Sequence, residues 1–572
     1  MYSEYEIQNV PLTLKSSRQG VERFLDRNGL RLDDVDTYAV VTRIDGDEIL
    51  AGGGLQGNVI KCLAVDETLR GTGMMQRLIS HLLSIAHDRG HNCVRVFTKP
   101  ENRDIFESLS FTTLATAPRA IFMEHGMPGI GAYTAYLRSL RREGTSGLIV
   151  MNANPFTLGH RALVEWAAQQ VDTLYVMVVR EDVSQFRYAD RLAMVRSGCR
   201  DIANVVVVEG SDYAISATTF PSYFIKERTA VTDAQIALDL DVCANHLMPA
   251  LGATVRLVGD EPLDALTARY VELMQTILPA HGLDVKVMPR LRHGDSVVSA
   301  SLVRKHLADG HLAQAAQLVP QSTVPSLIAQ LATRALTIEL DTTPKPGLVD
   351  KVDNGAHRDM DYGIMAQSIA ALQPIFTQLA HLPQAPASAI VELGKQGEQV
   401  MLQATGGVNT HRGALFSLGL AVVAATRCTV LDATSLQRHI ADVAQEIPGT
   451  HGTHGAAAVA QHKVAGALAM AQGGYKMLFD SWLPRYDALA GDPWQAHKTL
   501  MHIMGTLDDT NVIHRVGYDR AQEVKAEAKA LLSDFTEQRL RALNATYIEH
   551  NISPGGAADM LSLTILIHSL LH

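Results

Sequence analysis

The sequence predicts a multi-domain protein in which two α/β domains are followed by a domain built only of helices. In residues 1–128, short β-branched runs alternate with turns, which is typical of antiparallel strands. Between residues 129 and 322, apolar runs alternate with helical stretches, so a Rossmann-like parallel sheet of βαβ units is expected. Over residues 323–572 the strand pattern stops, and alanine- and leucine-rich stretches predict an all-α bundle.

The composition argues against several classes of protein. The 572 residues are 47% hydrophobic and carry a net charge of −10, which is typical of a soluble chain, and no basic stripe points to nucleic acid. The N-terminus lacks a signal-peptide pattern, and the apolar runs are shorter than the roughly 20 residues that cross a membrane. Five scattered cysteines without a Cys-x-x-Cys pair favour a reducing compartment. We therefore expect a cytoplasmic protein with no membrane or nucleic-acid partner.

The first domain holds a glycine-rich loop after its first strands. Apolar runs at 38–42 and 59–65 predict antiparallel strands, and Arg70-Gly-Thr-Gly73 then opens a helix. This order resembles the GNAT acetyltransferase fold, whose Arg-x-x-Gly-x-Gly/Ala loop binds the pyrophosphate of acyl-CoA. Met75 stands at the last motif position, where a side chain hinders the approach of pyrophosphate, so binding without acetyl transfer is expected. The resemblance implies that a CoA-like arm is bound by Arg70, Gly71 and Gly73.

Five short apolar runs predict the parallel sheet of the second domain. The first run leads through a polar bend to Gly159 and His160 at the start of a helix. A helix N-terminus offers unpaired N–H groups to an anion, and a glycine lets a phosphate approach the backbone. His160 and Arg161 stand where they could add positive charge. The predicted strands are Leu148–Met151, Thr173–Val179, Val205–Glu209, Thr254–Val258 and Val285–Met288.

Two motifs in this domain resemble the signatures of the adenylyl-transfer superfamily. Thr157-Leu-Gly-His160 resembles its His-x-Gly-His turn, with threonine at the first position. Ser299-Ala-Ser-Leu-Val-Arg304 resembles its Ile-Ser-Ser-Thr-x-x-Arg turn. The resemblance implies that His160 stabilises the α-phosphoryl group of ATP and that the second motif holds the departing pyrophosphate. The expected ATP-binding residues are Asn154, Thr157, Gly159, His160, Ser299, Ser301 and Arg304.

Four longer segments, at 152–160, 219–227, 259–264 and 288–290, resemble citrate lyase ligase, and this resemblance extends over nearly all of residues 1–310. It implies an enzyme that uses ATP and acetate to acetylate the thiol of a phosphoribosyl-dephospho-CoA group on the acyl carrier subunit of citrate lyase. AMP and pyrophosphate are released. The family places asparagine after the tyrosine at position 270, whereas this chain has Val271.

Two charged positions in these segments have alternative interpretations. Lys226 could place a point charge on a phosphate, or it could be a solvated residue ahead of Glu227. Glu261, together with Asp260, could hold Mg²⁺ through waters, or the two carboxylates could belong to a capped loop end. The residues alone do not separate these alternatives.

Several polar loops interrupt the helices expected in the third domain, and a purely structural bundle would have little use for them. Two of them read Thr-Pro-Lys-Pro-Gly-Leu-Val-Asp and Gly-Gly-Val-Asn-Thr-His-Arg-Gly. Together they resemble triphosphoribosyl-dephospho-CoA synthase over residues 326–572. That family joins the 2′-hydroxyl of dephospho-CoA to C1 of the ribose of ATP and releases adenine. The loops lie at Thr342–Asp350, Asn354–Asp361, Thr405–Gly413, Asp508–Arg515 and Ser553–Asp559.

Such chemistry needs a carboxylate near the positively charged C1, groups that move protons, and cations for the phosphates. The resemblance implies that Asp359 or Asp509 stands beside C1 and that His357 or His411 transfers protons. Asp361 is expected either to bind Mg²⁺ or to cap the helix that follows it. The residues expected to bind phosphates, with Mg²⁺, are Lys345, Gly406, Gly407, Arg412 and Arg515.

The two resemblances support each other, because the product of the synthase is the precursor of the group that the ligase acetylates. We therefore expect a fused enzyme that uses ATP and Mg²⁺ and has no tightly bound organic cofactor. One departure concerns Leu468 and Met470, which stand where the synthase family has charged residues. Two alternatives stay open. Only one half is active and the other docks the carrier protein, or a pantetheine- or nicotinamide-type adenylyltransferase is fused to an unrelated helical domain.

Overall fold

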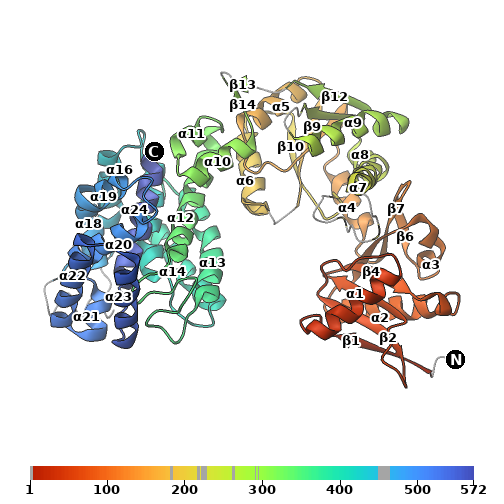
Figure 1. The fold of residues 1–572 in the computed structure, drawn as a ribbon. Coiled ribbons are helices and arrows are strands. Elements are labelled where there is room, and N and C mark those ends of the chain that lie inside the picture. The colour runs from red at the N-terminus through yellow and green to blue at the C-terminus, as the bar shows by residue number, and fades with distance from the viewer. Residues whose placement is uncertain are drawn as a thin grey trace. The chain divides into compact units, whose positions relative to one another are not determined.

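The computed structural model describes residues 4–180, 184–215, 220, 224, 228–260, 264–289, 292–293, 296–448 and 464–572. The chain forms two compact units (Figure 1). The first contains Met1–Ala153 and Gly159–Val297, and the second contains Asn154–Leu158 and Val298–His572. Within the described ranges, no helix is long and apolar enough to cross a membrane.

The first unit begins with a seven-stranded sheet of order β1-β2-β3-β4-β5-β7-β6. Neighbouring strands run antiparallel except β4 and β5, which pair in parallel where Val59 and Ile60 meet Arg95 and Val96. The strands are β1 (Tyr5–Val10), β2 (Thr37–Arg43), β3 (Ala51–Gln56), β4 (Val59–Val65), β5 (Cys93–Thr98), β6 (Thr112–Ala117) and β7 (Ala120–Gly126). The helices are α1 (Lys15–Arg27), α2 (Met74–Asp88) and α3 (Arg103–Glu107).

The strands predicted at 38–42 and 59–65 correspond to β2 and β4, and β3 lies between them. The sequence did not indicate β3, because three consecutive glycines carry little strand propensity. These glycines are packed against large neighbours. A Cβ at Gly52 would lie 2.8 Å from the Tyr38 ring, and one at Gly53 would lie 2.6 Å from Leu63. The strand conformation of β3 is therefore stabilised by neighbouring side chains that pack against its glycines.

A second sheet in the same unit has five parallel strands in the order β10-β9-β8-β11-β12. All five correspond to predicted strands. The chain runs from central β8 outward to β10 and then returns to β11 on the other side, so the strand order reverses beside the carboxyl end of β8. Ligands of open α/β sheets bind at such reversal points. The strands are β8 (Ser146–Met151), β9 (Thr173–Val178), β10 (Val205–Glu209), β11 (Val255–Gly259) and β12 (Asp284–Met288).

Helices alternate with these strands, as the βαβ pattern predicts. They are α4 (Ile130–Ser139), α5 (Leu158–Ala168), α6 (Tyr188–Gly198), α7 (Arg228–Val242), α8 (Met248–Leu251) and α9 (Ala265–Ala280), followed by a short hairpin of β13 (Arg292–His293) and β14 (Ser296–Val297). The two sheets share a continuous apolar core. At their junction the rings of Phe97 and Phe122 stack at 4.4 Å, and Glu124 accepts hydrogen bonds from the Tyr213 hydroxyl (2.6 Å) and the Ile130 amide (2.8 Å).

The second unit is helical throughout its described residues. Helix α24 is apolar around its circumference and is buried over most of its length, and it packs against α12, α15 and α20. The helices are α10 (Ala300–Asp309), α11 (Leu312–Ala316), α12 (Val324–Asp341), α13 (Tyr362–Ala380), α14 (Ala387–Ala404), α15 (Arg412–Arg427), α16 (Ala433–Gln445), α18 (Ala467–Gln472), α19 (Leu483–Ala488), α20 (Gln495–Thr506), α21 (Thr510–Val516), α22 (Tyr518–Ser533), α23 (Glu537–Glu549) and α24 (Gly555–Leu571). The strand pattern of residues 129–297 therefore gives way to an all-α region, as predicted.

Candidate functional sites

A buried arginine forms hydrogen bonds with the backbone at the carboxyl ends of both β8 and β9. Arg191, on α6, is fully buried, and its Nη1 donates to the carbonyl of Asn152 (2.7 Å), to Oδ1 of Asn152 (2.6 Å) and to the carbonyl of Val179 (3.0 Å). Its Nε donates to the carbonyl of Phe186 at 3.0 Å. A buried guanidinium is tolerated only when its donors are satisfied. Arg191 thus fixes the backbone that leads into the predicted nucleotide turn, and the sequence analysis did not identify it.

The first nucleotide motif lies at the amino-terminal end of α5, which begins at Leu158. Gly159 and His160 therefore belong to the first turn of this helix, where amide groups lack helical partners. Arg161 does not face an open site, because its guanidinium forms a two-bond ion pair with Asp201 (2.7 Å each) and contacts Glu165 (2.7 Å). This guanidinium lowers the pKa of the Asp201 carboxyl to about 2.

The second nucleotide motif forms the amino-terminal end of α10. Ser299 caps the helix by accepting from the amide of Leu302 at 3.2 Å, and its hydroxyl lies 3.0 Å from the hydroxyl of Ser301. One turn later, Nη1 of Arg304 donates to the carbonyl of Asn154 at 2.5 Å. Burial lowers the pKa of Arg304 from its usual value near 12.5, which leaves the side chain charged at neutral pH. The contact joins segment 154–158 to the Ser299–Arg304 turn, and Thr157 in that segment is buried.

The second unit contains a cavity of about 460 Å³. Five loops that the sequence analysis singled out reach its wall, although the first and the last lie more than 200 residues apart in the chain. Helix ends and loops, rather than helix middles, supply most of its polar groups. The predicted site residues that line the cavity are Lys345, His357, Asp359, His411, Arg412, Asp509 and Arg515.

A buried ion pair lies at the wall formed by α12. Nζ of Lys345 donates to Oε1 of Glu339 at 2.5 Å, and both side chains are almost fully buried. The loop that carries Lys345 is fixed by a hydrogen bond from its own amide to Asp350 (3.0 Å). Its Gly347 has a positive φ of 72°, and a Cβ there would lie 2.0 Å from the carbonyl of Ile552. Glu339 was missed by sequence reasoning because it stands alone in an apolar helical stretch.

Two carboxyl groups lie where α24 begins. Asp509 caps α21 by accepting from the amides of Asn511 (2.8 Å) and Val512 (3.4 Å), and its other oxygen accepts from the amide of Ala557 (2.9 Å). Burial raises the pKa of Asp509, although these amides oppose the shift. Burial also raises the pKa of Asp559 well above its usual range, and the nearby carboxyls of Asp509 and Glu339 add to the shift. Asp559 belonged to a predicted polar loop but was given no role of its own.

His411 presents one ring nitrogen to the cavity. Its Nδ1 lies 2.8 Å from the Ser368 hydroxyl, which accepts a hydrogen bond from the Thr410 hydroxyl (2.7 Å). Its Nε2 is buried and has no hydrogen-bond partner among the described residues. Burial, with a smaller contribution from Lys345, lowers the pKa of His411 to about 3. The hydroxyl of Tyr475, which also lines the cavity, is likewise buried, and no residue in the described ranges forms a hydrogen bond with it.

His357 and Arg515 form a second polar cluster on the cavity wall. Nη2 of Arg515 lies 3.3 Å from Nδ1 of His357, and Nε2 of His357 lies 2.8 Å from the Ser553 hydroxyl. Burial and the Arg515 charge lower the pKa of His357. Asp359 is largely exposed, and its Oδ1 lies 3.8 Å from Nδ1 of His357. Since the guanidinium can only donate, Nδ1 of His357 accepts and its proton resides on Nε2.

Both halves of the chain match known families. The family model described as citrate lyase ligase C-terminal domain matches residues 146–327, and the model described as ATP:dephospho-CoA triphosphoribosyl transferase matches residues 325–572. The [citrate [pro-3S]-lyase] ligase of Haemophilus influenzae is 39% identical over 311 residues, which are 53% of this chain and 93% of that protein. The 2-(5''-triphosphoribosyl)-3'-dephosphocoenzyme-A synthase of Pectobacterium atrosepticum is 35% identical over 305 residues, which are 49% of this chain and 98% of that protein.

The chain belongs to both families. The ligase of Escherichia coli gives a similar match to the first half, with 38% identity over 53% of this chain and 88% of that protein. The resemblances to citrate lyase ligase and to triphosphoribosyl-dephospho-CoA synthase are thus confirmed, for what we call the ligase half and the synthase half.

Some further predicted residues of the ligase half are described by the structure, and two others lie outside the described residues. Lys226 and Glu261 are outside the described residues, so their roles stay predictions. Tyr270, which the family pattern flagged, donates a hydrogen bond from its hydroxyl to the buried carboxyl of Asp239. In the Arg70–Gly73 loop, Gly71 and Gly73 have positive φ values of 76° and 81°, and Arg70 is exposed and paired with Glu67 at 3.1 Å.

The synthase half also leaves three predicted residues away from the cavity wall. Oδ1 of Asp361 accepts from the amide of Ile364 at 2.8 Å and so caps α13, which is the alternative that the sequence left open. Gly406 and Gly407 have positive φ values of 66° and 95° and border open space. Arg412 lines the cavity but is held by Glu398 through contacts of 2.8 Å. Of the two departures from the family pattern, Met470 lines the cavity and Leu468 does not.

Proposed function

We propose that this chain is a bifunctional enzyme that both makes and activates the prosthetic group of citrate lyase. The synthase half forms 2′-(5″-triphosphoribosyl)-3′-dephospho-CoA from ATP and dephospho-CoA and releases adenine. The ligase half acetylates the thiol of the finished group on the acyl carrier subunit and releases AMP and pyrophosphate. The observation that carries this proposal is that the chain spans 93% of a ligase relative and 98% of a synthase relative.

In the ligase half, an acetate oxygen attacks the α-phosphorus of ATP, and the bond from that phosphorus to the bridging oxygen of pyrophosphate breaks. The thiol then attacks the acetyl carbon and AMP leaves. The first turn of α5, with Gly159 and His160, is proposed to stabilise the α-phosphoryl group. The facing hydroxyls of Ser299 and Ser301, with Arg304, are proposed to hold pyrophosphate. Arg304 would then exchange its contact with the carbonyl of Asn154 for the stronger one with phosphate.

The GNAT-like region is proposed to hold the CoA-like arm without performing acetyl transfer. The features that support this proposal lie in the Arg70–Gly73 loop and in the strands and helix beside it. The parallel β4–β5 pair interrupts an otherwise antiparallel sheet, and α2 starts directly after the Arg70–Gly73 loop. Gly73 is the N-cap of α2 in the left-handed conformation and offers no side chain as a cap, which leaves the first amides of this helix for an anion.

In the synthase half, the 2′-hydroxyl oxygen of dephospho-CoA attacks C1 of the ATP ribose, and the bond between C1 and the adenine nitrogen breaks. Adenine gains a proton and the hydroxyl loses one. The transition state carries positive charge near C1, so a buried carboxylate beside it is stabilising. We place C1 near Asp509 and Asp559 and the triphosphate near Arg412 and Arg515, because carboxylates suit the positive charge at C1 and guanidinium groups suit phosphates, and all four residues line the same cavity.

Proton transfer is proposed to involve Asp559. Two neighbouring carboxyls in a buried site do not both ionise. Several backbone amides favour the charged form of Asp509, whereas one, that of Ala414, favours the charged form of Asp559. Asp559 therefore keeps a proton at neutral pH, and this proton can pass to the adenine nitrogen as C1–N cleavage proceeds. The exposed carboxylate of Asp359 is proposed to accept the hydroxyl proton.

His411 is proposed to bind rather than to transfer protons. With the Thr410 hydroxyl donating to Ser368, the Ser368 hydrogen is available to Nδ1 of His411, which places the imidazole proton on Nε2. A group whose pKa is about 3 exchanges protons poorly at neutral pH. Its unpartnered Nε2–H is suited to donate a hydrogen bond to a ring nitrogen of adenine or to a phosphate oxygen.

Carboxylates at the cavity wall are candidate ligands of Mg²⁺. It usually binds one or two carboxylates together with substrate phosphates. Asp359 is an exposed carboxylate at the wall, whereas Asp508 is paired with Lys525 at 2.6 Å. Because Asp359 is proposed to act as the base, Mg²⁺ would be held chiefly by the phosphates of ATP, whose charge it would neutralise.

Two single substitutions test whether both halves act. His160→Ala should remove acetate-dependent AMP formation and leave adenine release unchanged. Asp559→Asn should do the reverse. If either variant lost both activities while staying folded, the proposal of two independent active sites would fail. Loss of neither activity would contradict the assignment of these residues.

A further inference from the structure

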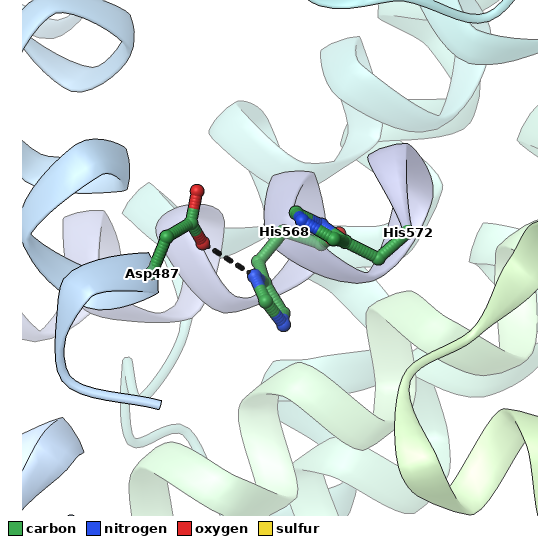
Figure 2. A group of neighbouring side chains, drawn as sticks. All are labelled: Asp487, His568 and His572. Carbon is green, nitrogen blue, oxygen red and sulfur yellow. Dashed lines mark hydrogen bonds and ion pairs between the residues drawn. The ribbon is translucent and has the colours of Figure 1, made fainter. Parts of the chain in front are cut away.

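The end of α24 carries a second polar cluster, separate from the cavity. His568 and His572 stand four residues apart on this helix, and Asp487 approaches them from the end of α19 (Figure 2). Asp559, which lines the cavity, is nine residues earlier on α24, which is roughly 13 Å along a helix axis. Among the described residues, this trio forms a group in which one ligand atom from each side chain lies within 4.8 Å of the others.

Hydrogen bonds fix the same tautomer on both imidazoles. Nδ1 of His568 lies 2.6 Å from Oδ1 of Asp487, and Nδ1 of His572 lies 2.9 Å from the carbonyl of His568. A carboxylate and a carbonyl can only accept, so Nδ1 carries the proton on each ring. Both Nε2 atoms therefore hold a lone pair when the rings are neutral. Metal-bound histidines typically donate their other N–H to a carboxylate or a backbone carbonyl in this way.

The side chains of Asp487 and His568 are partly buried, whereas that of His572 is exposed. Asp487 supplies a negative charge that an isolated histidine pair would lack.

We propose that His568 and His572 bind Zn²⁺ through their Nε2 atoms, with Asp487 as a carboxylate ligand or as the partner that orients His568. Two imidazoles and a carboxylate suit Zn²⁺ and exclude a preference for Mg²⁺, which takes oxygen ligands. The rings now stack with centroids 4.4 Å apart and an angle of 28° between their planes. Binding requires them to turn until both lone pairs converge, and rotation about the last side-chain bond of histidine is broad.

A zinc ion bound here would cross-link α19 to the last turn of α24. These two helices already pack against each other in the described structure. Because the same α24 carries Asp559 near its other end, this cross-link would stabilise a helix that forms part of the cavity wall. The inference does not depend on the reaction proposed for that cavity.

The test is zinc binding to the full chain, measured by competition with a chromophoric chelator at pH 7.5, because the chain has 23 histidines and the comparison must be between variants. His572 is exposed, so His572→Ala should fold normally. We expect wild type to bind one equivalent more than His568→Ala or His572→Ala at micromolar free Zn²⁺. Asp487→Asn should weaken that equivalent by about 10- to 100-fold.

His550→Ala is the matched control. His550 follows α23 and its Nδ1 contacts the carbonyl of Thr546 at 2.8 Å, the same local contact that His572 makes, but it belongs to no such trio. This variant should bind as many equivalents as wild type. Zinc should also raise the Tm of wild type and of His550→Ala more than that of His572→Ala. Equal stoichiometry and affinity in wild type and His572→Ala would overturn the proposal and leave an Asp487–His568 ion pair at a helix end.

Discussion

Gly413 leaves the space that the carboxyl group of Asp559 occupies. A Cβ built on Gly413 would lie 2.0 Å from Oδ2 of Asp559, far inside contact distance. Gly413 is the second residue of α15, and Asp559 lies more than 140 residues later, on α24. The requirement for glycine at this position is thus set by a carboxyl group from a helix that is distant in the sequence.

Replacing Gly413 with alanine should therefore displace Asp559 and lower adenine release at least 100-fold, because proton donation depends on the position of the acid. Adenine release and Tm are the measurements. Gly394→Ala is the control, since Gly394 lies in α14 and a Cβ there meets nothing within 4 Å. That change should leave activity intact and stabilise the helix by up to about 1 kcal/mol. Equal activity in Gly413→Ala and wild type would show that Asp559 does not need its observed position.

The proposed role of His411 predicts different behaviour for two substitutions. His411→Gln keeps a side-chain N–H donor and should retain about 10-fold more adenine release than His411→Ala, which removes it. The pH dependence of kcat in wild type and His411→Gln should have the same limbs, because a group with a pKa of about 3 does not titrate near neutrality. A limb near pH 6 to 7 that disappears only in His411→Gln would instead identify His411 as a proton-transfer group.

His411 should also make stability depend on pH. Its pKa is about 3 when folded and about 6.5 when unfolded, so the unfolded chain binds more protons between these values. The free energy of unfolding should fall as the pH falls below about 6.5, by up to about 1.4 kcal/mol per pH unit from this residue. Thermal unfolding at pH 7.5, 6.0 and 5.0 should show a shallower loss in His411→Gln. Parallel curves for the two proteins would contradict the burial of a neutral imidazole.

The Lys345–Glu339 pair predicts strong coupling between two substitutions. Glu339→Gln alone leaves a buried ammonium without its counter-charge and should cost about 3–5 kcal/mol of stability. The double variant Lys345→Met/Glu339→Gln removes both charges and should be more stable than Glu339→Gln or Lys345→Met alone, although adenine release would stay impaired. Chemical unfolding of the four proteins gives the coupling free energy. Additive effects would show that the two charges do not interact in the folded state.

In the ligase half, Arg191→Lys should lower AMP formation about 10- to 100-fold, because an ammonium cannot reproduce the fork of donors that holds the ends of β8 and β9. Adenine release should be unchanged. Arg196→Lys on the same helix is the control, since Arg196 is half-exposed and contacts only Glu209 among the described interactions. A similar loss in both variants would mean that α6 as a whole, and not the Arg191 contacts, determines activity.

The parts of the fold that the sequence predicted are those with a local signal. Strand β8 is an apolar run buried on both faces, and its bounds of Ser146–Met151 include the predicted run Leu148–Met151. Strand β3 was missed because Gly52, Gly53 and Gly54 acquire their strand conformation from packing with Tyr38 and Leu63.

The candidate site shows the same limit. Loop residues such as Lys345 and Asp509 were recognisable because glycine, proline and charge interrupt an apolar helical pattern. Glu339 and Arg191 were not, because each stands in a helix where a charged residue normally faces solvent. The capping role of Asp361 is a local contact that the sequence offered as one of two alternatives. The neutrality of His411 depends on burial among residues that no local pattern identifies.

The central claim is tested most directly by measuring free adenine after the pure protein is mixed with ATP, Mg²⁺ and dephospho-CoA, with chromatography and mass detection of both products. We predict adenine and an equal amount of triphosphoribosyl-dephospho-CoA in wild type, neither when dephospho-CoA is omitted, and at least 100-fold less of both in Asp559→Asn. No adenine from the folded wild-type protein would contradict the claim that the synthase half is active and would leave the ligase activity alone.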